Sequence, residues 1–157
     1  HHSYVVPRPY CDWYDPADIP PPVRAEGELD RLPPFYRTIH EEGTKPWKCV
    51  SGRFGPTRHT DEEIRHILAL TYGMVSCTDA AIGRMLDGLE ETGLADNTVV
   101  CFLADHGDMM GDHGILNKGP FHFDGLVRMP LIWRRPGCIE PGTRTDDAAS
   151  TLLPIAR

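Results

Sequence analysis

The sequence lacks a long hydrophobic run, and its basic residues are outnumbered by acidic ones. No apolar stretch approaches the roughly 20 residues that a membrane-spanning helix needs, so no membrane span is expected. The 16 Lys and Arg residues against 23 Asp and Glu residues give a formal net charge of −7. Nucleic acids and anionic membranes require a basic surface, so we expect neither as a partner. A small anionic substrate stays compatible with this charge, because a local cation can bind it.

The sequence also lacks any Cys-x-x-Cys pair, the spacing typical of zinc or dithiol chemistry. Its five cysteines are scattered: Cys11, Cys49, Cys77, Cys101 and Cys138. An odd and unpaired set favours a reducing compartment, and with it a cytoplasmic location. There is no initiator methionine, and residues 1–4 resemble neither a signal peptide nor a natural start. We therefore expect that the N-terminus is cut and that targeting information is missing.

Proline is abundant in the first third of the chain. A length of 157 residues allows one core, so one domain is expected. Within it, residues 1–59 are predicted to form an irregular arm and residues 60–157 an ordered body. Long helices and central strands are excluded from the arm, with a short helix expected at 32–42. The prolines responsible are Pro7, Pro9, Pro16, Pro20, Pro21, Pro22, Pro33, Pro34, Pro46 and Pro56.

The ordered body begins with the signature of a helix N-terminus. Thr60 followed by Glu63 forms a capping box, which satisfies the free amides of a first turn. Gly93 is a natural residue to end the helix. The spacing predicts one long amphipathic helix between them, with an irregularity near residues 73–79. The apolar and small residues that recur at helical spacing are Ile64, Ile67, Leu68, Thr71, Met74, Val75, Ile82, Met85, Leu86 and Leu89.

Two apolar stretches then flank a glycine-rich loop. Residues 98–104 are rich in β-branched and aromatic side chains and predict a fully buried strand. Residues 127–133 predict a second strand, and the polar residues 105–120 lie between the two. Helix, strand, loop and strand together indicate an α/β fold.

The loop begins with two side chains that can bind a metal. Asp105 and His106 follow the first predicted strand directly, and ligands of α/β proteins gather at such strand ends. An oxygen and a nitrogen ligand suit a divalent cation. Two ligands do not complete a site, so other segments must supply the rest.

Lys118 lies at the other end of the loop, immediately before a Gly-Pro pair. A lysine held in this position can stabilise negative charge on a transferring sulfuryl or phosphoryl group. His113 is predicted to fix the loop by hydrogen bonding. Asp108 and Asp112 are predicted to support the ligands or face solvent.

Together these residues resemble the C-terminal metal-binding block of the type I sulfatases, in the alkaline-phosphatase-like superfamily. The resemblance extends to the helix before the block and to the first residues of the chain, so it covers nearly all of the sequence. The segments that carry it are Thr98–Gly137, with Asp105-His106-Gly107-Asp108, Gly111-Asp112-His113-Gly114, Lys118-Gly119-Pro120, Phe121-His122-Phe123-Asp124-Gly125 and Val127-Arg128-Met129-Pro130-Leu131-Ile132, then Thr78-Asp79-Ala80-Ala81-Ile82-Gly83, and His1-His2-Ser3-Tyr4-Val5-Val6-Pro7-Arg8-Pro9-Tyr10.

The resemblance implies an α/β/α sandwich with a mixed sheet, of which this chain would supply two strands and one long helix. It implies that Asp105 and His106 are two ligands of a divalent metal, most often Ca²⁺, with Mg²⁺ and Mn²⁺ as alternatives. It also implies that Lys118 contacts the ester oxyanion. Many sulfatases have asparagine where His106 stands, and histidine there is also typical of relatives that cleave phosphate or phosphonate esters.

By the same resemblance, His1 matches the histidine that assists the leaving group. Ser3 stands where proline is usual, which leaves His2 as an alternative for that role. Asp124 replaces the more common glutamate, and its role stays open.

The nucleophile of the family is a formylglycine made from cysteine or serine in Cys/Ser-x-Pro-x-Arg, upstream of the histidine segment. The stretch Cys49-Val50-Ser51-Gly52-Arg53 imitates this spacing. It lacks the central proline and follows the histidine segment, so we interpret it as a decoy and expect the formylglycine outside this chain.

The sequence therefore predicts part of a metal-dependent sulfuric ester hydrolase, inactive alone, that acts on a small-molecule ester. A phosphoric or phosphonate monoester hydrolase on the same scaffold is the alternative that His106 favours. A non-catalytic remnant or interaction domain is a second alternative, which the missing nucleophile favours.

Overall fold

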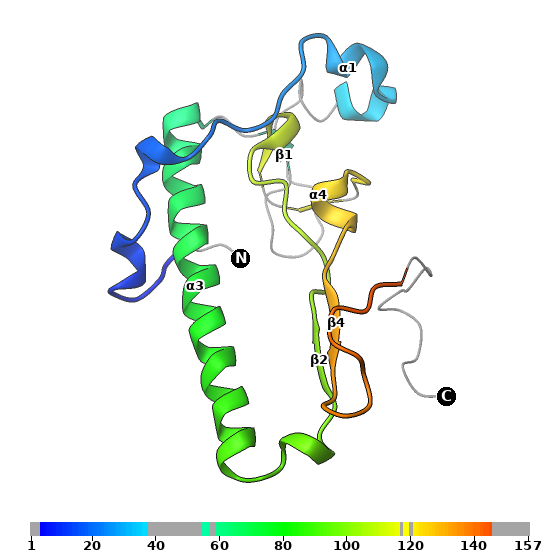
Figure 1. Ribbon diagram of the computed structural model, residues 1–157. Coiled ribbons are helices and arrows are strands. Elements are labelled where there is room, and N and C mark those ends of the chain that lie inside the picture. Colours follow the sequence, from blue (N-terminus) through cyan, green and yellow to red (C-terminus); the bar gives the residue numbers. More distant parts are fainter. Residues whose placement is uncertain (1–3, 38–54, 57–58, 117, 120, 146–157) are drawn as a thin grey trace, which may run out of the picture.

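The computed structural model describes residues 4–37, 55–56, 59–116, 118–119 and 121–145. A single long helix runs beside a two-stranded ribbon, and a cluster of short elements packs at one end of both (Figure 1). In chain order the elements are η1 Tyr10–Asp12, η2 Pro16–Asp18, α1 Glu28–Arg31, β1 Gly55–Pro56, α3 Asp61–Glu91, η3 Ala95–Asn97, β2 Val100–Leu103, η4 Asp112–Gly114, β3 Ile115–Leu116, α4 Asp124–Val127 and β4 Leu131–Arg134.

The long helix α3 begins and ends where the sequence predicts. The Glu63 amide donates to Thr60 Oγ1 at 3.2 Å, and the Thr60 amide donates to the Glu63 carboxylate at 2.8 Å, which completes the capping box. Gly93 follows the helix with φ +69°. The irregularity expected near residues 73–79 is wrong, because α3 is continuous over 31 residues. Among the described residues, no helix has both the length and the apolar character that crossing a membrane requires.

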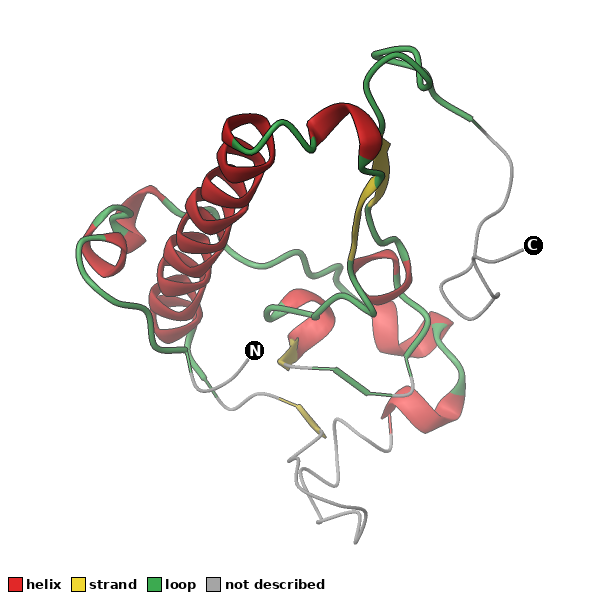
Figure 2. Ribbon diagram, turned by 90° about the horizontal axis from the view of Figure 1, so that it is seen from below, coloured by secondary structure: helices red, strands yellow, loops and turns green. Residues whose placement is uncertain are grey.

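The proline-rich arm lies along α3, as Figures 1 and 2 show in two orientations. Its described part has only short 3₁₀ and α-helical turns, as its prolines predict. Val6 and Ile19 are buried, and α3 has a glycine, Gly73, where the arm crosses it closely. The short helix expected at 32–42 is present at residues 34–37; residues 32–33 are not helical, and residues 38–42 lie outside the described residues.

The strands β2 and β4 pair antiparallel, with Val100 opposite Arg134 and Phe102 opposite Ile132. The second strand starts later than predicted, because residues 124–127 form the short helix α4. The expectation of a fully buried first strand is also wrong for the described chain. Phe102 is 41% exposed and Ile132 is 58% exposed. The ribbon is mainly apolar, and the described residues leave Phe102, Leu103, Leu131, Ile132 and Trp133 exposed.

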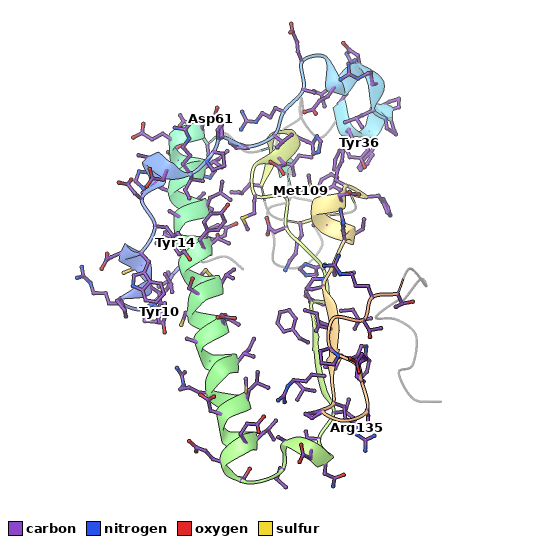
Figure 3. All side chains as sticks on the ribbon, viewed as in Figure 1. Tyr10, Tyr14, Tyr36, Asp61, Met109 and Arg135 are labelled. Carbon is purple, nitrogen blue, oxygen red and sulfur yellow. The ribbon has the colours of Figure 1, made fainter. Side chains whose placement is uncertain are left out.

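Apart from Ile64 of α3, the most buried side chains lie in the loop between the two strands. They form a core with Tyr36 of the arm, and Figure 3 labels Tyr36 and Met109 at this end of the molecule. The members of this core are Tyr36, Met109, Ile115, Phe121 and Leu126. A second small ribbon pairs β1 with β3. The loop that carries the predicted site residues is therefore held by its own core.

Candidate metal and anion site

Asp105 and His106 leave the end of β2 with their side chains turned toward each other. The Nε2 atom of His106 lies 3.5 Å from Asp105 Oδ2. The Nδ1 atom of His106 lies 2.8 Å from the carbonyl oxygen of Gly107, which can only accept, so Nδ1 carries the proton. In the neutral ring this leaves the lone pair on Nε2, beside the carboxylate. A hydrogen bond from the second ring nitrogen is the usual way in which proteins orient a metal-binding histidine.

The Asp105 carboxylate is held in its charged form. Its Oδ1 atom accepts a 3.0 Å hydrogen bond from the backbone amide of His106, and the positive charges of His106, when its ring is protonated, and of Lys118 add to this effect. Together these interactions lower the pKa of Asp105 below its ordinary value. The side chain is 87% exposed, so it is accessible to an ion from solution.

The charge of Lys118 is the last of the causes that lower the pKa of Asp105. A turn follows Lys118, in which the Phe121 amide donates to the Gly119 carbonyl at 2.8 Å. A Cβ atom at Gly119 would lie 2.6 Å from the Phe121 ring, and that ring is buried in the loop core. The structure thus pairs the two predicted metal ligands, and Lys118 acts on Asp105 through its charge.

Backbone contacts shape the start of the loop. The Gly107 amide donates a 2.9 Å hydrogen bond to the Leu126 carbonyl. Asp108 accepts a hydrogen bond from the Met110 amide at 3.0 Å, and Met110 has φ +49°. Asp108 therefore fixes a turn, a supporting role that agrees with its prediction.

His113 fixes the loop by hydrogen bonding, as predicted. Its Nδ1 atom lies 2.9 Å from Glu28 Oε2 in α1, and its ring stacks on Phe123 with centroids 3.9 Å apart. Sequence reasoning missed Glu28 and Phe123 as partners. Glu28 lies 85 residues away from His113, and no local signal in the sequence could have linked the two.

The N-terminal segment approaches the same loop. Burial, followed by the negative charge of Asp108, raises the pKa of Tyr4 to about 12. Tyr4 is three positions after His1, whose own placement lies outside the described residues, as does Cys49-Val50-Ser51-Gly52-Arg53. The role predicted for His1 stays a prediction.

Asp105 and His106 fit a divalent cation as a partial ligand set. Within the ranges that the structure describes, no group of three or more His, Cys, Asp or Glu side chains could hold a metal ion. The two ligands converge and one is a hard carboxylate, but a complete coordination shell requires further groups.

Comparisons with known proteins show which family the chain resembles. The sequence profile of the sulfatase family matches residues 34–156. The chain is 32% identical over 164 residues to the multifunctional alkaline phosphatase superfamily protein PehA of Trinickia caryophylli, covering 98% of this chain and 31% of that protein. It is 31% identical over 144 residues to an arylsulfatase of Clostridium perfringens, covering 92% and 27%.

The fold has relatives among solved structures. The phosphonate monoester hydrolase SpPMH from Silicibacter pomeroyi superposes with a TM-score of 0.68 at 33% identity, over 87% of this chain and 27% of that one. The chain belongs to the sulfatase family of the alkaline-phosphatase-like superfamily, which confirms the predicted family and α/β fold. It spans less than a third of the length of these relatives.

Proposed function

We propose that this chain forms part of a longer metal-dependent hydrolase of small-molecule sulfate esters, called the parent enzyme below. The observation that carries the proposal is the pairing of Asp105 and His106 directly after β2, with the positive charge of Lys118 acting on the Asp105 carboxylate. A carboxylate, an imidazole with a free lone pair and a lysine form half of a site for a metal and an ester anion. Membership of the sulfatase family supports sulfate as the anion.

Asp105 and His106 would hold the cation, which we propose to be Ca²⁺, with Mg²⁺ and Mn²⁺ as alternatives. When bound, a divalent cation acts as a Lewis acid toward the oxygens of the ester. The hydrogen bond from His106 Nδ1 to the Gly107 carbonyl keeps Nε2 available in the neutral ring. Further ligands would come from residues outside the described part or outside this chain.

Lys118 would bind the non-bridging oxygens of the ester and stabilise the charge that grows on them during transfer. His1 would donate a proton to the leaving oxygen, a role supported by the approach of Tyr4 to the loop. The nucleophile would be a formylglycine supplied by the parent enzyme from another segment. This division of roles explains why we expect the chain alone to be inactive.

The exposed faces of the ribbon support a longer catalytic domain. A groove of about 570 Å³ separates α3 from the ribbon and is lined mainly by apolar side chains, among them Met74, Ile82, Phe102 and Ile132. Burial of apolar area is worth about 25 cal/mol per Å², so an open groove of this kind favours being covered. We propose that further strands of the parent enzyme cover it.

The proposal is tested by assaying the parent enzyme on a matched pair of aryl sulfate and aryl phosphate esters. A sulfatase rate that exceeds the phosphatase rate, and that a chelator abolishes, supports the proposal. A dominant rate on phosphate or phosphonate esters would instead support the second candidate, a phosphoric or phosphonate monoester hydrolase. The histidine at position 106 and the likeness to a phosphonate monoester hydrolase favour that candidate.

A third candidate is a non-catalytic remnant or interaction domain. Titration of the parent enzyme with Ca²⁺, Mg²⁺ and Mn²⁺ separates it from both enzyme hypotheses. Saturable binding of a divalent cation that is lost in Asp105→Asn supports the enzyme hypotheses. Absence of divalent-cation binding in the unmodified protein supports the non-catalytic candidate.

A further inference from the structure

We propose that Glu28 and His113 form a positioning pair that couples the arm to the loop carrying Asp105, His106 and Lys118. The inference deepens the proposed function and rests on it for its catalytic consequence. Neither residue is proposed to touch the ester or the metal. Their role is to select the one loop conformation in which the two ligands, Asp105 and His106, face each other.

The contacts of His113 place it between two segments that are distant in sequence. On one side its Nδ1 atom donates to Glu28 Oε2 over 2.9 Å, and on the other its ring stacks on Phe123 at an interplanar angle of 12°. The side chain of His113 is 28% exposed and that of Glu28 is 15% exposed. A hydrogen bond of this kind between partly buried groups is shielded from water and has a defined geometry.

The backbone at His113 needs support of this kind. Its φ of +54° is in the left-handed region, where a residue other than glycine is strained. The His113 amide donates to the Val23 carbonyl at 2.8 Å, and the Val23 amide donates to Asp112 Oδ1 at 2.7 Å. The arm therefore binds this turn by its backbone at Val23 and by its side chain at Glu28.

A short chain of contacts leads from the pair to the metal ligands. Phe123, which stacks on His113, is the N-cap of α4, and the Leu126 and Val127 amides both donate to its carbonyl. The Leu126 carbonyl accepts the Gly107 amide at 2.9 Å. Gly107 follows His106 directly, and its carbonyl accepts from His106 Nδ1. A displaced His113 ring would thus move the acceptor that orients the metal-binding imidazole.

Stability alone is a weak reason for this pair. Removing a carboxylate and an imidazole from water has a desolvation cost that largely offsets their attraction, and such pairs often contribute little net stability. The loop already has an apolar core in Met109, Ile115 and Phe121. The pair adds a directional contact, which the apolar core does not provide.

The test compares variants in the parent enzyme. Glu28→Ala removes the acceptor, Glu28→Gln keeps an acceptor oxygen without the charge, and Glu26→Ala removes an exposed carboxylate two positions away as the matched control. Three quantities are measured: the Ca²⁺ dissociation constant, kcat and KM on an aryl sulfate, and hydrogen–deuterium exchange over residues 105–119. The melting temperature is followed in parallel.

We expect Glu28→Ala to weaken Ca²⁺ binding by about 10- to 100-fold, the range typical of groups that orient metal ligands. Exchange over residues 105–119 should rise, kcat should fall, and Glu28→Gln should restore most of each loss. Glu26→Ala should match the unmodified enzyme. Glu28 also accepts a longer hydrogen bond from the Ala25 amide, at 3.4 Å. A double-mutant cycle with His113→Ala separates the Glu28–His113 contact from that contribution. The double variant should lose no more Ca²⁺ affinity than the more affected of the two single variants.

Equal exchange and equal Ca²⁺ affinity in Glu28→Ala and Glu26→Ala would overturn the inference. So would additive losses in the cycle, or a loss of activity fully accounted for by a lower melting temperature. Exchange is measured without substrate, so it separates the two proposals. Increased exchange in Glu28→Ala alongside an unmodified enzyme that does not cleave sulfate would reject the proposed function and keep the pair.

Discussion

The backbone amide of Gly107 donates to the carbonyl of Leu126 at 2.9 Å, and this contact leaves no room for a side chain at residue 107. A Cβ atom there would lie 1.8 Å from the Gly125 carbonyl oxygen. The metal loop and α4 are thus locked together by backbone. The residue that follows the predicted ligand pair is a glycine for reasons of space.

Gly107→Ala is therefore expected to separate the loop from α4. The obstruction is backbone against backbone, so neither partner can relax by a change of rotamer, and we expect a loss of about 3 kcal/mol of unfolding free energy in the parent enzyme. Urea unfolding monitored by circular dichroism measures it. Gly83→Ala is the control, because no atom of the described chain lies within 4 Å of a Cβ there. In mid-helix that change should stabilise by about 1 kcal/mol. Equal effects of the two variants would contradict the prediction.

Gly73→Ala is expected to release the arm from α3. A Cβ atom at Gly73 would lie 2.4 Å from the Tyr10 carbonyl oxygen. Alanine in place of glycine stabilises a helix by about 1 kcal/mol. We expect the free energy lost when the arm no longer packs on α3 to be larger than this gain. Limited proteolysis should cut residues 4–20 faster in this variant than in Gly83→Ala. Gly83→Ala makes the same change in α3 at a position where a Cβ atom would not meet the arm. Unchanged protection of the arm is the outcome that counts against close packing at Gly73.

The capping box predicts an acid-dependent contribution to the stability of α3. The hydrogen bond from the Thr60 backbone amide is the largest cause that lowers the pKa of Glu63 below its ordinary value of 4.5. A depressed folded-state pKa gives stability that is present above the unfolded pKa and is lost as the pH falls through the folded pKa. Glu63→Ala should therefore lower the melting temperature at neutral pH, and the difference from the unmodified protein should shrink below about pH 4.5.

Glu62→Ala is the matched control for the cap, because Glu62 is also exposed in the first turn but is outside the capping box. Thr60→Ala should destabilise by about 1 kcal/mol at neutral pH, the usual value for loss of an N-cap. A pH-independent effect of Glu63→Ala would show that its carboxylate charge does not act through the cap.

Variants of Asp105 and Lys118 should separate metal binding from charge stabilisation. Asp105→Asn is expected to weaken Ca²⁺ binding in the parent enzyme, and activity should return in part at high Ca²⁺. Lys118→Met should leave Ca²⁺ binding nearly unchanged while kcat falls by about 10²- to 10³-fold, the usual cost of losing one group that stabilises transition-state charge. Calorimetric titration and steady-state kinetics on an aryl sulfate measure the two effects. Lys118→Arg, which keeps the charge, is the control.

Local patterns predicted those parts of the fold that depend on near neighbours. The capping box at Thr60, the end of α3 at Gly93 and the presence of two apolar strands all follow from contacts a few residues apart or from apolar runs. The burial of the first strand could not be predicted from local patterns. An apolar stretch indicates that a strand can be buried on both faces, but the residues that would cover it need not lie in the same chain segment.

For the candidate site, too, local properties were predictable and long-range contacts were not. The sequence by itself determined that Asp105, His106 and Lys118 are chemically suited to a metal and an anion, because donor type and loop glycines are local properties. Only the tertiary structure decided that His106 turns Nε2 toward Asp105 and that Glu28 holds His113. Those contacts depend on the path of the arm across the molecule, which places residues 85 positions apart within hydrogen-bonding distance. No short-range pattern encodes that path.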